Sequence, residues 1–200
     1  MKKLIPQFLV YTFVSISSVL FLNCSSEQNI TVDQAVTEYK TKTGKTIIVT
    51  ETHPVGQSLS TIQITTKDFV HNISETYTDL DPISDVLIAD LDANGFDEIY
   101  IVTRSAGSGS YGKIMGFASN FDKSLSMINF PEISEGDSRF DGYMGHDSFG
   151  IEAKKLIRTF PVYREGDSNR NPTGGMRKLF YGLYPGEAMW QLRILETWVD

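Results

Sequence analysis

The chain has 200 residues, 40% of them hydrophobic, and a formal net charge of −7 at pH 7. This length allows one domain with a sizeable hydrophobic core. The acidic balance and the lack of any basic run exclude a typical nucleic-acid binder and favour a cationic partner. The single cysteine, Cys24, excludes an internal disulfide, so the fold depends on its core.

Residues 1–23 have the features of an export signal. Lys2 and Lys3 precede an apolar run without charges from Phe8 to Leu22, which is short for a membrane span. The run ends just before Cys24, in a segment that resembles a bacterial lipobox, whose cysteine is lipidated and becomes the new N-terminus. The alternative is an ordinary cleaved signal followed by a free thiol. We expect an exported bacterial lipoprotein, periplasmic or anchored in the outer membrane, and loss of the two lysines changes its net charge from −7 to −9.

The polar segment 24–35 is expected to be a tether that precedes one domain of residues 36–200. Two interpretations fit the end of this segment. One is a helical turn capped by Thr31 and Gln34. The other, which we favour, is a β-hairpin that turns at Lys42–Lys45.

Beyond this point the pattern indicates β-strands almost throughout. Thr61–Thr65 alternates apolar and polar residues, as in a strand with one solvent face, whereas Val86–Ala89 and Ile99–Val102 are continuous apolar runs typical of central strands. Further strands are predicted at residues 46–50, 114–118, 125–130, 149–153, 156–160, 176–184 and 189–198. Short runs separated by Gly, Pro, Asn and Asp predict an all-β fold, an antiparallel β-sandwich or a flattened barrel. Residues 135–200 either extend this sandwich or form a separate surface.

An acidic turn separates two of the predicted strands, with oxygen-bearing side chains spaced as in calcium-binding loops. Asp90, Asp92, Asn94 and Glu98 occupy positions one, three, five and nine, and a glycine occupies position six. The EF-hand would place a Glu at position twelve, which is Ile101 here, and would have flanking helices. Two interpretations therefore remain: a calcium site with these four ligands, or a tight turn in which Asp and Asn cap backbone amides.

The loop Arg104–Gly112 is rich in Gly and Ser and follows an apolar strand. Such residues contribute little to a core and cost backbone entropy to hold in place. A loop of this composition on a rigid strand, ending in Tyr111, indicates a surface presented to a partner.

Catalytic signals are weak. His146 beside Asp147 fits either the catalytic pair of a hydrolase or, as we favour, a hydrogen-bonded loop histidine. No nucleophile elbow or metal-binding histidine spacing is present in the sequence. The sequence therefore predicts a protein that is not an enzyme.

From Asp90 to Tyr111 the chain resembles the periplasmic inhibitors of invertebrate-type (i-type) lysozyme, with weaker similarity from about Gly44 to Phe130. The shared elements are the acidic Asp-x-Asp-x-Asn-Gly-x-x-Glu turn, an apolar strand, and Arg-Ser-Ala-Gly-Ser-Gly-x-Tyr. The resemblance implies an all-β sandwich, a homodimer, and a protruding Ser-Gly-x-Tyr loop that plugs the lysozyme active-site cleft.

By this resemblance, the loop residues Ser108, Gly109, Ser110 and Tyr111 contact the lysozyme, and Ser108 and Tyr111 enter its cleft. Arg104, at the base of the loop, either pairs with a lysozyme acid or holds the loop by binding carbonyls. A plug of this kind needs small residues, hydroxyls that bind carboxylates and a rigid aromatic anchor. The opposing hypothesis is a calcium-dependent binding or adhesion lipoprotein that uses the turn from Asp90 to Glu98.

Overall fold

The computed structural model describes residues 32–200. The expected signal peptide, Cys24 and most of the expected tether lie outside the described residues. The first strand, β1 (Val32–Lys40), begins four residues before the expected start of the domain, so the end of the tether is part of the sheet. Within residues 32–200, no helix is long and apolar enough to cross a membrane.

The first sheet has four antiparallel strands in the order in which they occur in the chain. They are β1, β2 (Thr46–Pro54), β3 (Ser60–Lys67) and β4 (Ser74–Leu80). The hairpin favoured from the sequence is confirmed, because β1 pairs with β2 across a turn in which Gly44 has φ 84°. β3 alternates buried and partly exposed residues along Ser60–Thr66, as its sequence predicts for a strand with one core face.

The second sheet has eight strands in the order β5-β6-β7-β8-β12-β11-β10-β9. They are β5 (Ile83–Ala89), β6 (Glu98–Arg104), β7 (Gly112–Ser119), β8 (Leu125–Asn129), β9 (Ser148–Glu152), β10 (Lys155–Pro161), β11 (Met176–Pro185) and β12 (Trp190–Val199). A short 3₁₀ turn, η1 (Ser138–Phe140), lies in the connection from β8 to β9. Strands β5–β8 and β9–β12 each form an antiparallel meander of consecutive strands.

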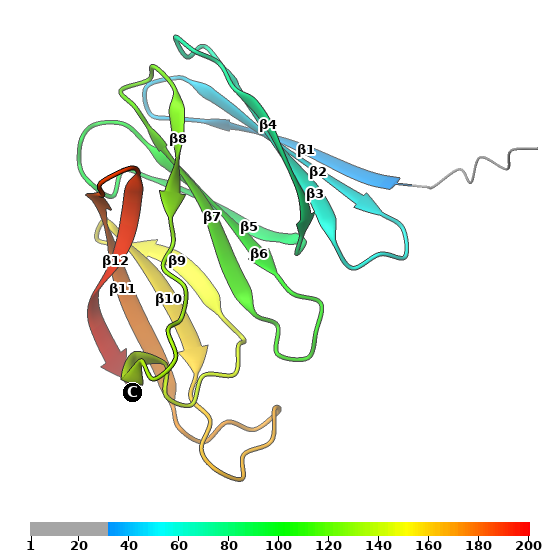
Figure 1. The fold of residues 1–200 in the computed structure, drawn as a ribbon, viewed down its shortest axis with the longest axis vertical. Coiled ribbons are helices and arrows are strands. Elements are labelled where there is room, and N and C mark those ends of the chain that lie inside the picture. The colour runs from blue at the N-terminus through cyan, green and yellow to red at the C-terminus, as the bar shows by residue number, and fades with distance from the viewer. Residues whose placement is uncertain (1–31) are drawn as a thin grey trace, which may run out of the picture.

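The two meanders join through a parallel pairing of only two residue pairs, Trp190 with Ile128 and Gln191 with Asn129. The outermost strands β5 and β9 also contact each other, so the sheet curls back on itself. The molecule therefore has three four-stranded layers, β1–β4, β5–β8 and β9–β12, and Figure 1 shows β1–β4 and β9–β12 on opposite sides of β5–β7. The expected all-β, sandwich-like fold is confirmed, with one parallel pairing in place of a purely antiparallel arrangement.

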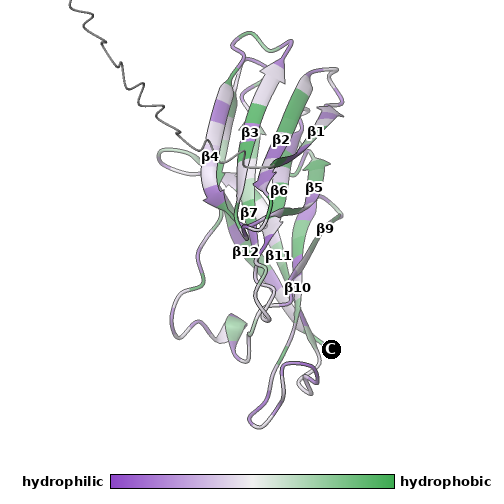
Figure 2. Cartoon of the chain, turned by 90° about the vertical axis from the view of Figure 1, so that its right-hand side faces the viewer, coloured by the Kyte–Doolittle hydropathy of each residue, from purple (hydrophilic) through white to green (hydrophobic). Residues whose placement is uncertain are grey.

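The middle layer separates two hydrophobic cores. Ile99 and Ile101 of β6 pack toward the first sheet, in a core that includes Ile47 and Ile62, while Tyr100 faces the core formed with β9–β12. β6 is thus buried on both faces, which explains its continuous apolar sequence. Hydrophobic segments lie along the strands of the layers, and most loops are hydrophilic (Figure 2).

Two features differ from the sequence-based expectation. β4 was not predicted, because Ser74–Leu80 is largely polar and forms an exposed edge strand in which no residue is fully buried. Residues 135–200 are an integral part of the fold, since they supply the whole third layer and half of the second core.

Candidate functional site

The loop of residues 105–111 connects β6 to β7 and projects from one end of the middle layer (Figure 1). Its base is closed by two hydrogen bonds between Ser105 and Tyr111: the Ser105 amide donates to the Tyr111 carbonyl (3.0 Å), and the Tyr111 amide donates to Ser105 Oγ (2.9 Å). At the tip, the Ser110 amide donates to the Gly107 carbonyl (2.9 Å). The loop is therefore a compact turn with its own backbone hydrogen bonds.

The predicted contact residues reach the solvent at this tip. Ser108 is exposed, and 44% of Tyr111 is exposed. The Tyr111 ring lies edge-on to the ring of Tyr143, with centroids 5.7 Å apart. A Cβ at Gly109 would lie 2.4 Å from a Tyr111 ring carbon, so only glycine lets the aromatic ring fold against the tip. The tip thus combines an exposed hydroxyl with a supported aromatic side chain.

A second loop, residues 141–147, packs against the tip. The His146 amide donates to the Gly109 carbonyl at 2.7 Å. This close approach requires Gly145, which has φ 90° and whose Cβ, if present, would lie 2.0 Å from the Gly109 oxygen.

A third loop, residues 162–175 between β10 and β11, holds the neighbouring carbonyl. Asn169 Nδ2 donates to the Ser108 carbonyl at 2.8 Å, and Asn169 Oδ1 lies 3.1 Å from His146 Nε2. Two successive tip carbonyls, those of Ser108 and Gly109, are therefore fixed from two other loops. The backbone of the tip is held in one shape while the side chains of Ser108 and Tyr111 stay exposed.

A buried ion pair lies beneath the loop. Arg158 Nε donates to Asp147 Oδ1 at 2.7 Å, and the side chains of the two residues are 3% and 0% exposed. Asp147 Oδ2 accepts hydrogen bonds from the Gly112 amide (2.8 Å) and the Tyr143 hydroxyl (2.7 Å). The Tyr143 hydroxyl in turn accepts a hydrogen bond from Arg158 Nη2 at 2.6 Å. Asp147 thereby joins β7, β10 and the 141–147 loop at the point where the site loop ends.

The Arg158 guanidinium is surrounded by aromatic side chains. Its central carbon lies between 4.9 and 5.9 Å from the centroids of five rings, those of Phe130, Phe140, Tyr143, Phe149 and Phe160. Ring faces attract a desolvated cation. Burial alone would lower the pKa of Arg158, but the hydrogen bond to Asp147 and the attraction of the nearby acidic groups together offset this, and the pKa lies above its ordinary value. Arg158 is therefore a permanent cation at the centre of the loop support.

The proposed His146–Asp147 catalytic pair is not formed in this geometry. The Asp147 carboxylate bonds to Arg158, Gly112 and Tyr143, while the His146 ring bonds to Asn169. His146 is a loop histidine, as favoured from the sequence.

Arg104 ends β6, and its amide donates to the Pro82 carbonyl at 2.9 Å. Within residues 32–200, the tip carbonyls accept hydrogen bonds from Asn169 and the His146 amide, and not from Arg104. The loop-holding role expected as one alternative for Arg104 is thus taken by residues of the C-terminal third of the chain.

An apolar groove of about 760 Å³ adjoins Tyr111. It runs along β7, β8 and the segment that follows β8, and its lining includes Ile114, Met115, Met127, Phe130 and Ile133. Met127 and Ile133 are 40% and 38% exposed. The site loop therefore stands beside a hydrophobic surface.

The acidic turn lies between β5 and β6. One oxygen from each of Asp90, Asp92 and Glu98 lies within 4.8 Å of the others, so the structure brings three of the four expected ligands together. Asn94 instead supports the turn: its Nδ2 donates to Asp92 Oδ2 (2.8 Å), and its Oδ1 accepts a hydrogen bond from the Phe96 amide (2.8 Å).

Lys42, in the β1–β2 turn, reaches this acidic turn from the first sheet. Its ammonium forms an ion pair with Asp90 and lies 3.9 Å from Asp97 Oδ1, while its amide donates to Asp97 Oδ2 at 2.5 Å. This contact could not be predicted, because nothing in a single sequence pairs Lys42 with residues about fifty positions away.

The electrostatics of the acidic turn reflect crowding of like charges. Burial, together with the charges of Asp92, Asp90 and Asp97, raises the pKa of Glu98 to about 8. Burial also raises the pKa of Asp92. For Asp90, burial acts in the same direction, but the hydrogen bonds from Lys42 and the Gly95 amide, together with the charge of Lys42, outweigh it and the pKa lies below its ordinary value. Only one carboxylate of the cluster therefore has a strong cationic partner.

The fold and these contacts define a class: a three-layer β protein that presents a backbone-anchored Ser/Gly/Tyr loop at one end. No known protein family, curated protein or solved structure matches the chain. The similarity to the i-type lysozyme inhibitors thus rests on the residues from Asp90 to Tyr111.

Proposed function

We propose that this protein is a lipid-anchored inhibitor of i-type lysozyme, which inserts the tip Ser108–Tyr111 into the active-site cleft and blocks it without chemistry of its own. The observation that carries the proposal is the exposed Tyr111 and Ser108 on a tip whose two central carbonyls are hydrogen-bonded to other loops. A plug binds best when its shape is fixed in advance, because less conformational entropy is lost on binding.

The chemistry of the tip suits a cleft that contains catalytic carboxylates. The Ser108 hydroxyl and the Tyr111 phenol are donors for such carboxylates, and Gly107 and Gly109 keep the tip narrow. Arg104, at the base, would meet an acidic group at the rim of the cleft. The apolar groove beside Tyr111 would cover the surface around the cleft.

The charge of the protein favours the same partner. A net charge of −7, or −9 without Lys2 and Lys3, accelerates encounter with a cationic lysozyme through electrostatic steering and disfavours nucleic acid. The membrane anchor through Cys24 and the periplasmic or outer-membrane location rest on the sequence alone. There the protein would protect peptidoglycan from host lysozyme, and the family resemblance makes a homodimer the expected form.

The test is a lysozyme inhibition assay with the purified protein against i-type, chicken-type and goose-type enzymes. We expect inhibition of the i-type enzyme. Tyr111→Ala is expected to raise the inhibition constant about 30-fold or more, as for an aromatic hot spot. Ser108→Ala is expected to raise it about 5- to 10-fold through loss of one hydrogen bond.

The matched control is Phe121→Ala, which removes an aromatic side chain that is 64% exposed in the β7–β8 turn, at the opposite end of β7. This variant should inhibit like the unmodified protein. Lack of inhibition against all three lysozymes, or equal losses in Phe121→Ala and Tyr111→Ala, would refute the proposal.

A further inference from the structure

The acidic turn has buried oxygen atoms that lysozyme inhibition does not use. Among residues 32–200, four buried side-chain atoms lack a hydrogen-bond partner, and two of them, Asp90 Oδ1 and Glu98 Oε1, belong to this turn. Glu98 is only 1% exposed, and its other oxygen accepts a hydrogen bond from the Leu91 amide at 2.8 Å. A buried carboxylate oxygen without a hydrogen-bond partner lowers the stability of the folded state. A bound ligand at these atoms would remove this penalty.

The distances fit a single calcium ion. Oxygens bound to the same Ca²⁺ at 2.3–2.6 Å lie at most about 5 Å apart, and Ca²⁺ accepts irregular geometry, whereas Mg²⁺ demands a near-ideal octahedron. The three oxygens from Asp90, Asp92 and Glu98 lie within 4.8 Å of one another. We propose that Asp90, Asp92 and Glu98 bind one Ca²⁺. This inference does not rest on the proposed lysozyme inhibition.

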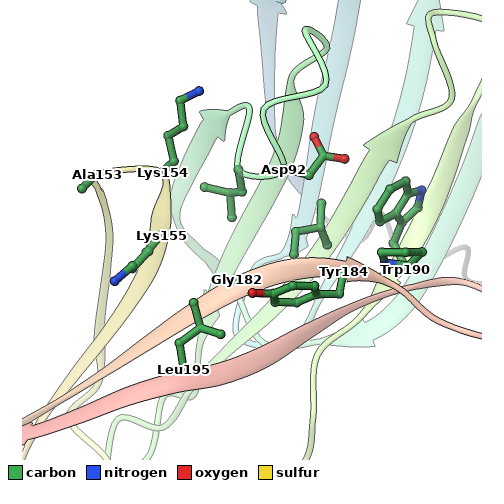
Figure 3. Close-up of a pocket in the computed structure, with 11 residues that line it drawn as sticks. Asp92, Ala153, Lys154, Lys155, Gly182, Tyr184, Trp190 and Leu195 are labelled. Atoms are coloured by element: carbon green, nitrogen blue, oxygen red, sulfur yellow. The ribbon is translucent and has the colours of Figure 1, made fainter.

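The site has access to solvent through Asp92. This residue and Leu91 line a pocket of about 490 Å³ that also includes Lys154, Tyr184 and Trp190 (Figure 3). Calcium takes six to eight oxygen ligands. Water molecules in this pocket would lie next to Asp92 and complete the coordination.

The local charge favours a cation. Asp90, Asp92, Asp97 and Glu98 place four carboxyl groups around the turn, and the Lys42 ammonium pairs with Asp90 and lies 3.9 Å from Asp97 Oδ1. The Lys42 side chain is 41% exposed and bonds to Asp90, whose Oδ1 remains free. Lys42 therefore acts as a partial internal counter-ion that competes with Ca²⁺.

Two lysines line the far side of the pocket. Lys155 pairs with Glu196, and in Figure 3 its side chain points away from Asp92. Its ammonium therefore does not neutralise the Asp92 carboxylate.

The experiment is calorimetric titration of the chelator-treated full chain with CaCl₂, together with melting curves in 10 mM CaCl₂ and in EGTA. We expect one site with a Kd of about 10⁻⁴ M, as in extracellular calcium modules. Binding to the folded state alone should then raise Tm by roughly 5–10 °C. The same concentration of MgCl₂ should give a much smaller shift.

Three variants assign the binding to this turn. Asp92→Asn and Glu98→Gln keep the size of each side chain and should each weaken Ca²⁺ binding at least tenfold, with melting curves in EGTA to show that they are folded. Glu152→Gln removes an exposed carboxylate at the end of β9 and should leave binding unchanged.

Lys42→Gln should tighten binding on the order of tenfold, because it removes a competing charge. Absence of binding heat and of a Tm shift at 10 mM CaCl₂ would overturn the proposal. Equal binding by the Glu98→Gln variant, or an equal response to MgCl₂, would do so as well.

Discussion

The buried pair Asp147–Arg158 makes the sharpest prediction about stability. Asp147→Asn keeps the shape of the side chain but removes its charge, and it leaves the guanidinium of Arg158 uncompensated at 3% exposure. Breaking a buried ion pair from one side costs about 3–5 kcal/mol. At 2–4 °C per kcal/mol, a chain of this size should lose roughly 6–20 °C in Tm.

A double-mutant cycle separates the ion pair from general damage to the core. Arg158→Met alone leaves the Asp147 carboxylate buried with two remaining donors, the Gly112 amide and the Tyr143 hydroxyl. In the double variant neither charge remains, so its loss in unfolding free energy should be smaller than the sum of the two single losses by about 2–4 kcal/mol. Urea unfolding followed by circular dichroism gives the unfolding free energies of the unmodified protein, the two single variants and the double variant. Strict additivity, or a cost below about 1 kcal/mol for Asp147→Asn, would refute the reasoning.

Three further predictions concern the loop support and the acidic turn. Asn169→Ala removes the hydrogen bond to the Ser108 carbonyl and should raise the inhibition constant about 5- to 10-fold with little change in Tm. Unchanged inhibition would show that this hydrogen bond does not position the tip. Gly145→Ala should destabilise the fold by about 1–3 kcal/mol in urea unfolding, since a Cβ would lie 2.0 Å from the Gly109 oxygen at φ 90°. Glu98 has a folded-state pKa of about 8, against an ordinary value of 4.5 for a solvated glutamate. The folded state therefore holds a proton that the unfolded state has lost within this window, and in EGTA its contribution to stability falls as pH rises from 4.5 to 8. Across this pH range, the unfolding free energy measured in urea should fall less for Glu98→Gln than for the unmodified protein. An equal fall in both proteins would contradict the assigned pKa.

The strands that could be predicted are those whose burial produces a recognisable pattern of apolar residues in the local sequence. β6 reads as continuous apolar residues because both of its faces are covered, and β3 alternates because only one is. β4 could not be predicted, because an edge strand needs few apolar residues to remain paired. The layer order and the parallel β8–β12 pairing depend on contacts between distant segments, which no local pattern encodes.

For the candidate site, too, some features could be predicted from the sequence and others could not. The spacing of Asp90, Asp92 and Glu98 predicts that their carboxylates converge, because alternate residues of a tight turn face one point. The exposed tip also follows from composition. The support for the tip does not: Asn169 lies 61 positions from Ser108, and Arg158 lies 11 positions from Asp147, in a strand that reads as core. Side chains that act through such tertiary contacts become visible only once the fold is known.

The junction between β8 and β12 has a consequence for how the protein assembles. Each of the three meanders is made of strands that are consecutive in sequence, so each can form early through local contacts. The eight-stranded sheet is completed only when β12, the last strand of the chain, reaches β8, and two residue pairs hold this seam. Amide protons at the seam should therefore exchange with deuterium sooner than those of β6, and we expect the sheet to open first at the seam.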